Sequence, residues 1–326
     1  MKKLIFASPG QVVLEQRDLP SLGKNSVLVR SECSLVSNGT ERTAFQGRFG
    51  VGTHWERWVQ YPFSPGYATA GTVLEIGPNV SLVKVGERVA LRAPHASHHV
   101  VAEGACIPIP GPVSPEDAVW FALSKIAFSG AWAAELKLGA SVAIIGAGPV
   151  AQMLVRWVAG GLPATLGILA KDRVRLERAK SGGMVVTIEG RTEEISAAQL
   201  EKALGGRPQV IFDCTADPGV LSWALGAIAD YGKVVLLGDP AMPNERRLTP
   251  DVLLRSISIT GVHDRSTFGR WNTQTISKLF FKRLREGSFS VGGLCTHVFA
   301  PEEAPQAYAL LDNSGAAGVL GIRFDW

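Results

Sequence analysis

The sequence has few of the features that mark exported, disulfide-rich or nucleic-acid-binding proteins. Its 326 residues include only four cysteines, with no Cys-x-x-Cys pair: Cys33, Cys106, Cys214 and Cys295. This spacing argues against a disulfide framework and a four-cysteine zinc lobe, and it favours a reducing, cytoplasmic setting. No run of eighteen apolar residues occurs, and the apolar start is too short for a signal-peptide core, so neither export nor membrane anchoring is expected.

An excess of charge of one sign is also missing. The 33 Lys and Arg residues exceed the 29 Asp and Glu residues by four, and five consecutive basic residues never occur. A small-molecule partner is therefore expected, and nucleic acid and membranes are not. The length predicts about two domains.

The hydrophobic pattern changes near residue 114. Before it, short β-type runs alternate with turn residues, at 12–14, 27–29, 70–76, 88–91 and 99–101. Ser114-Pro-Glu-Asp then predicts the start of a long helix to about Leu138. Apolar runs separated by helices follow at 142–145, 165–170, 184–188, 210–214 and 234–237. This alternation predicts a parallel sheet covered on both faces and an α/β fold, with a final strand at 318–324 that returns to the first domain.

A glycine-rich turn follows the first strand of the predicted sheet. Gly146 allows a tight turn, Gly148 lets a pyrophosphate approach the backbone, and Ala151 lets helix and strand pack closely. Pro149 and Val150 open the helix whose N-terminus faces the anion. The context predicts a dinucleotide site, and a glycine turn without a ligand is the alternative.

The end of the next strand bears on cofactor choice. An acid there would hold the ribose hydroxyls of NAD, but Ala170 is followed by Lys171, Asp172, Arg173 and Arg175. Cations suit a 2′-phosphate, so NADP(H) is favoured through Lys171 and Arg173. NAD(H) is the alternative, because Asp172 would reach the ribose if the alignment shifted by one or two residues. The cations could also be solvated charges at a helix start.

Five stretches together resemble the medium-chain dehydrogenase/reductase superfamily over essentially the whole chain. They are Ser37-Asn-Gly-Thr-Glu41, the segments 65–77 and 85–89, the turn at 146–151, and Phe212-Asp-Cys-Thr215. The resemblance implies a GroES-like β-rich catalytic domain formed by 1–122 and 265–326, around a Rossmann doubly wound domain at 123–264. It also implies a cleft where hydride passes to or from nicotinamide, cofactor contacts at Cys214, Thr215 and Gly238, and a homodimer.

The resemblance fails at the positions that hold catalytic zinc in zinc-dependent members. Those positions carry Asn38, Tyr67 and Lys125 here, and none of these is a usual zinc ligand. The lobe that holds a structural zinc is missing as well. The chain is therefore similar to the zinc-independent branch, with no metal expected.

Without a Lewis acid, another group must supply a proton or positive charge. We expect Tyr67 to donate a proton to a ketone, because a nearby ammonium, Lys125, favours its release and stabilises the oxyanion. Thr40 matches the family's hydroxyl relay, and Asn38 would donate a hydrogen bond to the same oxygen. In the alternative, Lys125 forms a salt bridge, for example with Glu41, and Tyr67 only packs.

Candidate substrate contacts are His95, Trp55 and Glu41. His95 lies in a short loop, and Trp55 lies in an insertion where the family places substrate-pocket walls. Ordinary core packing is the alternative for each. A metal at the histidine cluster is disfavoured, because His98 and His99 point to opposite faces of a strand.

The leading interpretation is a zinc-independent NAD(P)(H)-dependent oxidoreductase. Its substrate would be a carbonyl or alcohol on a small, cyclic, hydroxylated molecule or a secondary metabolite. One alternative is a quinone or enone reductase of the same superfamily. The other is a dinucleotide-binding protein that lacks catalysis.

Overall fold

The computed structural model describes residues 1–312 and 317–326, and the chain divides into two units. Unit 1 comprises Met1–Arg48, Arg57–Ala122 and Thr273–Trp326, so it contains both ends of the chain. Unit 2 comprises Phe49–Glu56 and Leu123–Asn272. The functional domain bounds at 122 and 264 stay a prediction, and each unit is described by itself below.

Unit 2 is built on a parallel sheet. Its strands are β8 (Ser141–Ile145), β9 (Thr165–Ala170), β10 (Val186–Glu189), β11 (Val210–Asp213), β12 (Lys233–Leu236) and β13 (Ser258–Gly261). Among the described residues they lie in the order β10-β9-β8-β11-β12-β13, and each neighbouring pair is parallel. The order reverses between β8 and β11, which makes this a doubly wound Rossmann sheet with its switch point there.

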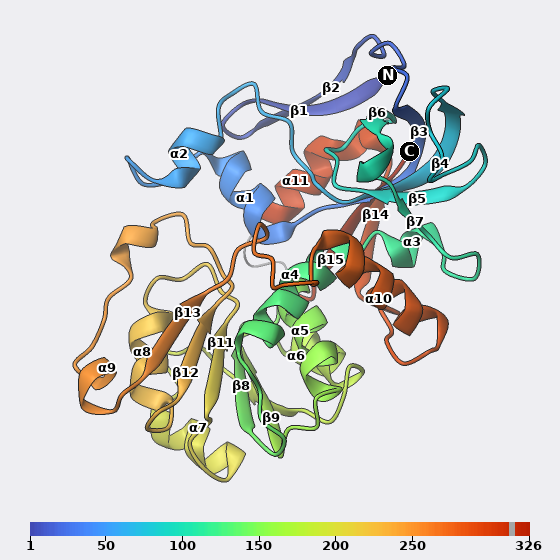
Figure 1. Ribbon diagram of the computed structural model, residues 1–326. Coiled ribbons are helices and arrows are strands. Elements are labelled where there is room, and N and C mark those ends of the chain that lie inside the picture. The colour runs from blue at the N-terminus through green and yellow to red at the C-terminus, as the bar shows by residue number, and fades with distance from the viewer. Residues whose placement is uncertain (313–316) are drawn as a thin grey trace. The chain divides into compact units, whose positions relative to one another are not determined.

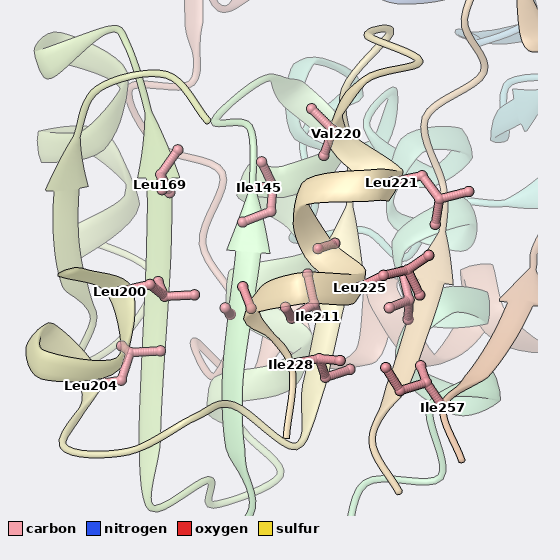
Figure 2. Close-up of a cluster of buried hydrophobic side chains, with 14 residues drawn as sticks. Ile145, Leu169, Leu200, Leu204, Ile211, Val220, Leu221, Leu225, Ile228 and Ile257 are labelled. Atoms are coloured by element: carbon pink, nitrogen blue, oxygen red, sulfur yellow. The ribbon is translucent and has the colours of Figure 1, made fainter. Parts of the chain in front are cut away.

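Helices cover both faces of this sheet (Figure 1). α5 (Pro149–Ala159) packs beside α6 (Arg173–Lys180), and α7 (Ala197–Leu204) packs beside α8 (Val220–Ala227). Figure 2 shows the buried cluster under α7 and α8, where Ile145, Ile211 and Leu225 meet. Ile144 alternates with Ile145 along β8 and is buried too, as expected for a strand covered on both sides.

Unit 1 contains an antiparallel-rich sheet. Its strands run in the order β14 (Cys295–Phe299), β15 (Gly321–Asp325), β3 (Ser26–Leu35), β4 (Thr69–Ile76), β5 (Arg88–Leu91) and β7 (Ile107–Pro108), with β6 (His98–Ala102) also on β3. β1 (Lys2–Ser8) and β2 (Gln11–Gln16) form a separate hairpin that the hydrophobic pattern only half predicts. β15 pairs with β3, so the last strand returns to the first domain as expected.

The remaining elements are short helices. Unit 1 holds α1 (Asn38–Gln46), α3 (Pro115–Ala118), α10 (Thr273–Arg285), α11 (Ala304–Asp312) and the 3-10 turns η1 (Glu103–Ala105) and η3 (Pro301–Glu303). Unit 2 holds α9 (Asp251–Leu254) and η2 (Pro243–Glu245), while α2 (His54–Trp58) and α4 (Phe121–Ala133) span the bounds of the two units. No described helix is both long and apolar enough to cross a membrane.

The predicted long helix from Ser114 is wrong in its extent. Ser114 does cap a helix, since its hydroxyl accepts from the Asp117 amide at 3.1 Å. The helix breaks after Ala118, however, and resumes as α4, which ends at Ala133. Glu135 then takes a positive φ of 53°, a conformation that a continuing helix does not allow.

Candidate active site

The glycine turn of unit 2 has the geometry of a pyrophosphate cradle. Gly146 follows β8 with a φ of +97°, and an added Cβ would lie 3.1 Å from the Thr215 side chain. Gly148 is the N-cap of α5, and a Cβ there would meet nothing within 4 Å. Open space therefore lies beside the uncapped N-terminus of an eleven-residue helix, where backbone N–H groups and the helix dipole attract an anion.

The opposite side of the switch point is formed by the loops after β11 and β12. Gly238 approaches Thr215 so closely that a Cβ would lie 1.6 Å from its carbonyl oxygen, so only glycine is accommodated. Asp213, which the sequence interpretation missed, fixes this loop by accepting from the Thr215 amide at 2.9 Å and hydroxyl at 2.7 Å. Burial raises the pKa of the Asp213 carboxyl, and Arg246 at 3.2 Å opposes that shift.

Some charged residues after β9 form hydrogen bonds and an ion pair, and others are exposed to solvent. The carboxylate of Asp172 caps α6 by accepting from the Arg175 amide at 3.1 Å, and it pairs with the Arg175 guanidinium at 3.1 Å. Lys171 and Arg173 are exposed at the same end of the sheet. The acid that could bind a ribose diol is thus committed to its own helix, while two cations lie in solvent.

Asn38 and Tyr67, two of the positions that the sequence resemblance aligns with zinc ligands, lie in unit 1. The amide nitrogen of Asn38 donates to the Leu320 carbonyl at 2.6 Å, and its buried Oδ1 accepts no hydrogen bond from the residues that the structure describes. Tyr67 is half-buried, and its hydroxyl lies 2.5 Å from the Ser37 hydroxyl. The Arg92 guanidinium stacks over the Tyr67 ring at 4.2 Å and makes a cation–π contact with it.

Lys125, the third position in that alignment, lies on the part of α4 that belongs to unit 2. Its side chain is 2% exposed, and its ammonium donates to the backbone carbonyls of Asp264 and Ser266. The Asp264 carboxylate lies 3.8 Å away. The alternative salt bridge of Lys125 therefore has Asp264 as its partner, whereas Glu41 bonds elsewhere.

The donor set at these positions does not fit zinc. Lys125 donates to oxygen atoms as a cation, the Asn38 amide nitrogen is bound to a carbonyl, and a neutral phenol hydroxyl is a poor ligand. Within residues 1–312 and 317–326, no three His, Cys, Asp or Glu side chains gather as a metal-binding group. No catalytic step is therefore assigned to zinc.

The expected substrate contacts His95 and Glu41 are buried against each other. Their exposed fractions are 0% and 1%, and His95 Nε2 lies 3.0 Å from the Glu41 carboxylate. His95 Nδ1 bonds the Ser34 hydroxyl at 2.7 Å, and Tyr308 donates to Glu41 at 2.6 Å. Substrate contact by this pair stays a prediction, and the geometry suits a supporting role better.

Trp55 is also largely covered. Its indole N–H donates to the Pro240 carbonyl at 3.1 Å, and its side chain is 2% exposed. Beside it, His54 bonds Asp239 at 2.7 Å. These contacts lie within unit 2, and a substrate contact by Trp55 stays a prediction.

Comparisons with known proteins agree with both halves of this description. The family model "Alcohol dehydrogenase GroES-like domain" matches residues 23–144, and "Zinc-binding dehydrogenase" matches residues 149–280. The L-threonine 3-dehydrogenase of Bacillus subtilis (strain 168) is 23% identical, with 94% of this chain and 93% of the relative covered. The sorbitol dehydrogenase of Rattus norvegicus is 26% identical, with 94% and 91% covered. The crystal structure of galactitol-1-phosphate dehydrogenase from Escherichia coli superposes with a TM-score of 0.85 at 18% identity and covers 100% of both chains.

A GroES-like domain and a doubly wound domain with a dinucleotide cradle define an oxidoreductase of the alcohol dehydrogenase type. The chain belongs to the medium-chain dehydrogenase/reductase superfamily and is an enzyme of that dehydrogenase family. The sequence resemblance is thereby confirmed for the fold and the enzyme class.

Proposed function

We propose that this enzyme is a zinc-independent, NADP(H)-dependent dehydrogenase that interconverts a carbonyl and an alcohol on a small, ring-bearing, hydroxylated molecule. The observation that carries the proposal is the replacement of three zinc-ligand positions by Asn38, Tyr67 and Lys125, each of which makes hydrogen bonds. Hydrogen-bond donors and a fixed cation can replace the electrostatic stabilisation that a metal supplies.

The cofactor contacts in this proposal come from unit 2. Gly146, Gly148, Pro149 and Val150 hold the pyrophosphate, while Cys214, Thr215 and Gly238 border the cofactor across the switch point. Lys171 and Arg173 select the 2′-phosphate, since Asp172 is committed to capping α6. When bound, the nicotinamide supplies or accepts the hydride.

Tyr67 is the proposed proton donor to the carbonyl oxygen during reduction. The Arg92 cation over the Tyr67 ring supports release of the proton. The sequence analysis had assigned this role to Lys125 alone. Lys125 stabilises the developing oxyanion, and Thr40 continues the path of the proton. In the oxidative direction the same groups run in reverse, and Tyr67 takes the proton of the alcohol.

Asn38 supports the choice of a hydroxylated substrate. Its Oδ1 is a buried acceptor that no described residue fills, and an unfilled buried acceptor costs about 1–3 kcal/mol. A substrate hydroxyl would donate to this oxygen. The expected role of Asn38 thus changes from donating to accepting, because its amide nitrogen is bound to the Leu320 carbonyl.

Two further proposals concern the state of the protein. We propose a homodimer, which sedimentation would test. A cytoplasmic location is supported by the four cysteines, which are all free thiols.

The proposal is tested by metal analysis together with a substrate screen. Protein purified without chelator should contain much less than one zinc per chain, and it should reduce ketones with NADPH. Tyr67→Phe should lower turnover at least about tenfold with NADPH affinity unchanged. One zinc per chain would contradict zinc independence, whereas activity on enones with none on ketones would favour the quinone or enone reductase alternative.

A further inference from the structure

Ser37 occupies a helix N-cap but does not act as one. It precedes α1 with an extended φ of −88° and ψ of 91°, the usual backbone of a capping serine, yet its side chain makes no capping hydrogen bond. Serine at this position normally accepts from the backbone of the first turn. The Ser37 hydroxyl is thus directed to another partner, although the residue is only 6% exposed.

That partner is Tyr67. The two hydroxyl oxygens are 2.5 Å apart, and the Ser37 hydroxyl also donates to Thr40 Oγ1 at 3.3 Å. A serine hydroxyl has one proton and two lone pairs, so when Ser37 donates to Thr40 it must accept from Tyr67. The three hydroxyls therefore form a chain from the half-buried phenol to Thr40, which is itself half-buried and within reach of water.

The backbone of Ser37 is fixed by Glu41. One carboxylate oxygen of Glu41 accepts from the Ser37 amide at 2.7 Å, and the other accepts from Tyr308 at 2.6 Å. Burial and the adjacent Glu41 raise the pKa of Tyr308 well above its usual range, so Tyr308 keeps its proton and donates. His95 lies 3.0 Å from the same oxygen.

The donors and acceptors of the hydrogen bonds that link Trp326, Ser34 and His95 to Glu41 can also be assigned. The Trp326 indole, which can only donate, bonds the Ser34 hydroxyl at 2.8 Å, and Ser34 bonds His95 Nδ1 at 2.7 Å. Ser34 can then donate to His95 Nδ1, which leaves the Nε2–H of His95 to donate to Glu41. Every member of this buried network is satisfied without solvent, which holds Ser37 in one orientation.

We propose that Ser37 is a proton-relay residue that carries the proton of Tyr67 to Thr40 when the alcohol is oxidised. The inference rests on the proposed role of Tyr67. As the Tyr67 oxygen takes the proton of the substrate hydroxyl, the Tyr67 O–H bond to Ser37 breaks and that proton passes to the Ser37 oxygen. The Ser37 proton then passes to Thr40, and the Thr40 proton passes to water. No electrons move along this chain, because they leave the alcohol carbon with the hydride.

The test compares Ser37→Ala with Ser37→Thr, which keeps the hydroxyl. Ser37→Ala should lower kcat at least about tenfold with KM changed less than about threefold, and Ser37→Thr should restore most of kcat. A proton inventory of kcat should curve in the wild type and become linear in Ser37→Ala. Ser97→Ala, a half-buried serine of the same unit that bonds the Lys2 amide and His98, is the matched control and should keep wild-type turnover.

An NMR measurement that needs no substrate tests the contact between Ser37 and Tyr67 independently of the proposed function. The sequence has four tyrosines, so ¹³C labelling of tyrosine gives few ring signals, and Tyr67→Phe assigns the one of interest. Ser37→Ala should shift the Tyr67 signal and leave the Tyr308 signal in place. If Ser37→Ala keeps wild-type kcat while Tyr67→Phe loses activity, the relay is wrong and the proton donor stands. If Tyr67→Phe keeps full activity, the proposed role of Tyr67 fails and the relay fails with it.

Discussion

At the scale of single residues, the buried polar groups decide what this enzyme can do. Lys125, Glu41 and His95 are each almost fully covered, and each has hydrogen-bond partners within its own unit. A buried charge without partners would cost several kcal/mol, so these contacts are a condition of folding. Tyr67, Thr40 and Asn38 are only half-buried, and we propose that they contact the substrate.

Replacement of Lys125 should affect both turnover and stability. Lys125→Met removes the ammonium from the Asp264 and Ser266 carbonyls, which leaves two acceptors without their donor. We expect turnover to fall at least about tenfold and the melting temperature to fall by a few degrees. Steady-state kinetics and calorimetry measure the two effects, with the exposed Lys137→Met as the control. Wild-type turnover in Lys125→Met would remove Lys125 from the catalytic proposal.

His99 should make the protein less stable as the pH falls. Burial first, then Lys3, His95 and His98, lower the pKa of His99 to about 4 from its ordinary 6.5. Between these values the unfolded chain binds a proton that the folded chain does not, so stability declines from about pH 6.5 down to about pH 4 and no further. At pH 5 the loss is about 2 kcal/mol.

The check on His99 is urea unfolding at pH 7 and pH 5. His99→Phe should lose less stability over this interval than the wild type, whereas the exposed His263→Gln should match the wild type. An equal decline in His99→Phe and the wild type would show that another group causes it.

The site residues named from the sequence stay a prediction, and the structure adds contacts of theirs that the sequence did not indicate. The positions of Asn38, Tyr67 and Lys125 follow from short motifs. The hydroxyl of Ser37 and the cation of Arg92 were missed, because their contacts join segments that are 30 and 25 residues apart in the chain. A serine in an N-cap motif is expected to cap its helix, and nothing local indicates that Ser37 instead bonds Tyr67.

At the scale of elements, the glycine positions show what the cofactor turn requires. Gly148 and Gly238 lie at the carboxyl ends of β8 and β12, and the space around them differs completely. An added Cβ at Gly148 meets nothing within 4 Å, whereas at Gly238 it meets the Thr215 carbonyl oxygen at 1.6 Å. The first glycine leaves room for a ligand, and the second permits two loops to approach.

The two glycines should therefore respond differently to alanine. Gly148→Ala should keep the wild-type melting temperature and weaken NADPH binding at least about tenfold, because its Cβ would occupy the space of the pyrophosphate. Gly238→Ala should lower the melting temperature, because the backbone must move. Gly226→Ala, on α8 with nothing within 4 Å, is the control for both measurements. Unchanged NADPH affinity in Gly148→Ala would place the pyrophosphate elsewhere.

The strands of unit 2 were predictable because strands covered on both faces are continuous apolar runs. The runs at 142–145 and 165–170 match β8 and β9 to within one residue. The extent of the helix after Ser114 was not predictable from the sequence, because no proline or glycine marks the break at Val119 and Trp120. Both residues are buried, so tertiary packing overrides the helical pattern there.

At the scale of the whole molecule, both domains of the family are recognisable in the chain. The GroES-like and Rossmann domains of the medium-chain dehydrogenases are present, as the sequence predicted. The Rossmann domain was predictable because its glycine turn and strand periodicity are local signals, whereas the GroES-like domain was expected from the resemblance to the family. The substrate was not predictable, because it is selected by side chains from many segments, and a fold hosts many substrates.

The central claim is tested most directly by a fluorescence titration of the purified, metal-analysed protein with NADPH and NADH side by side. The account predicts saturable NADPH binding at least about tenfold tighter than NADH, a difference of roughly 1.4 kcal/mol. Replacement of both Lys171 and Arg173 by alanine should remove that preference and leave NADH binding unchanged. Tighter binding of NADH would contradict the NADP(H) assignment, and binding of neither cofactor would contradict the dehydrogenase account itself.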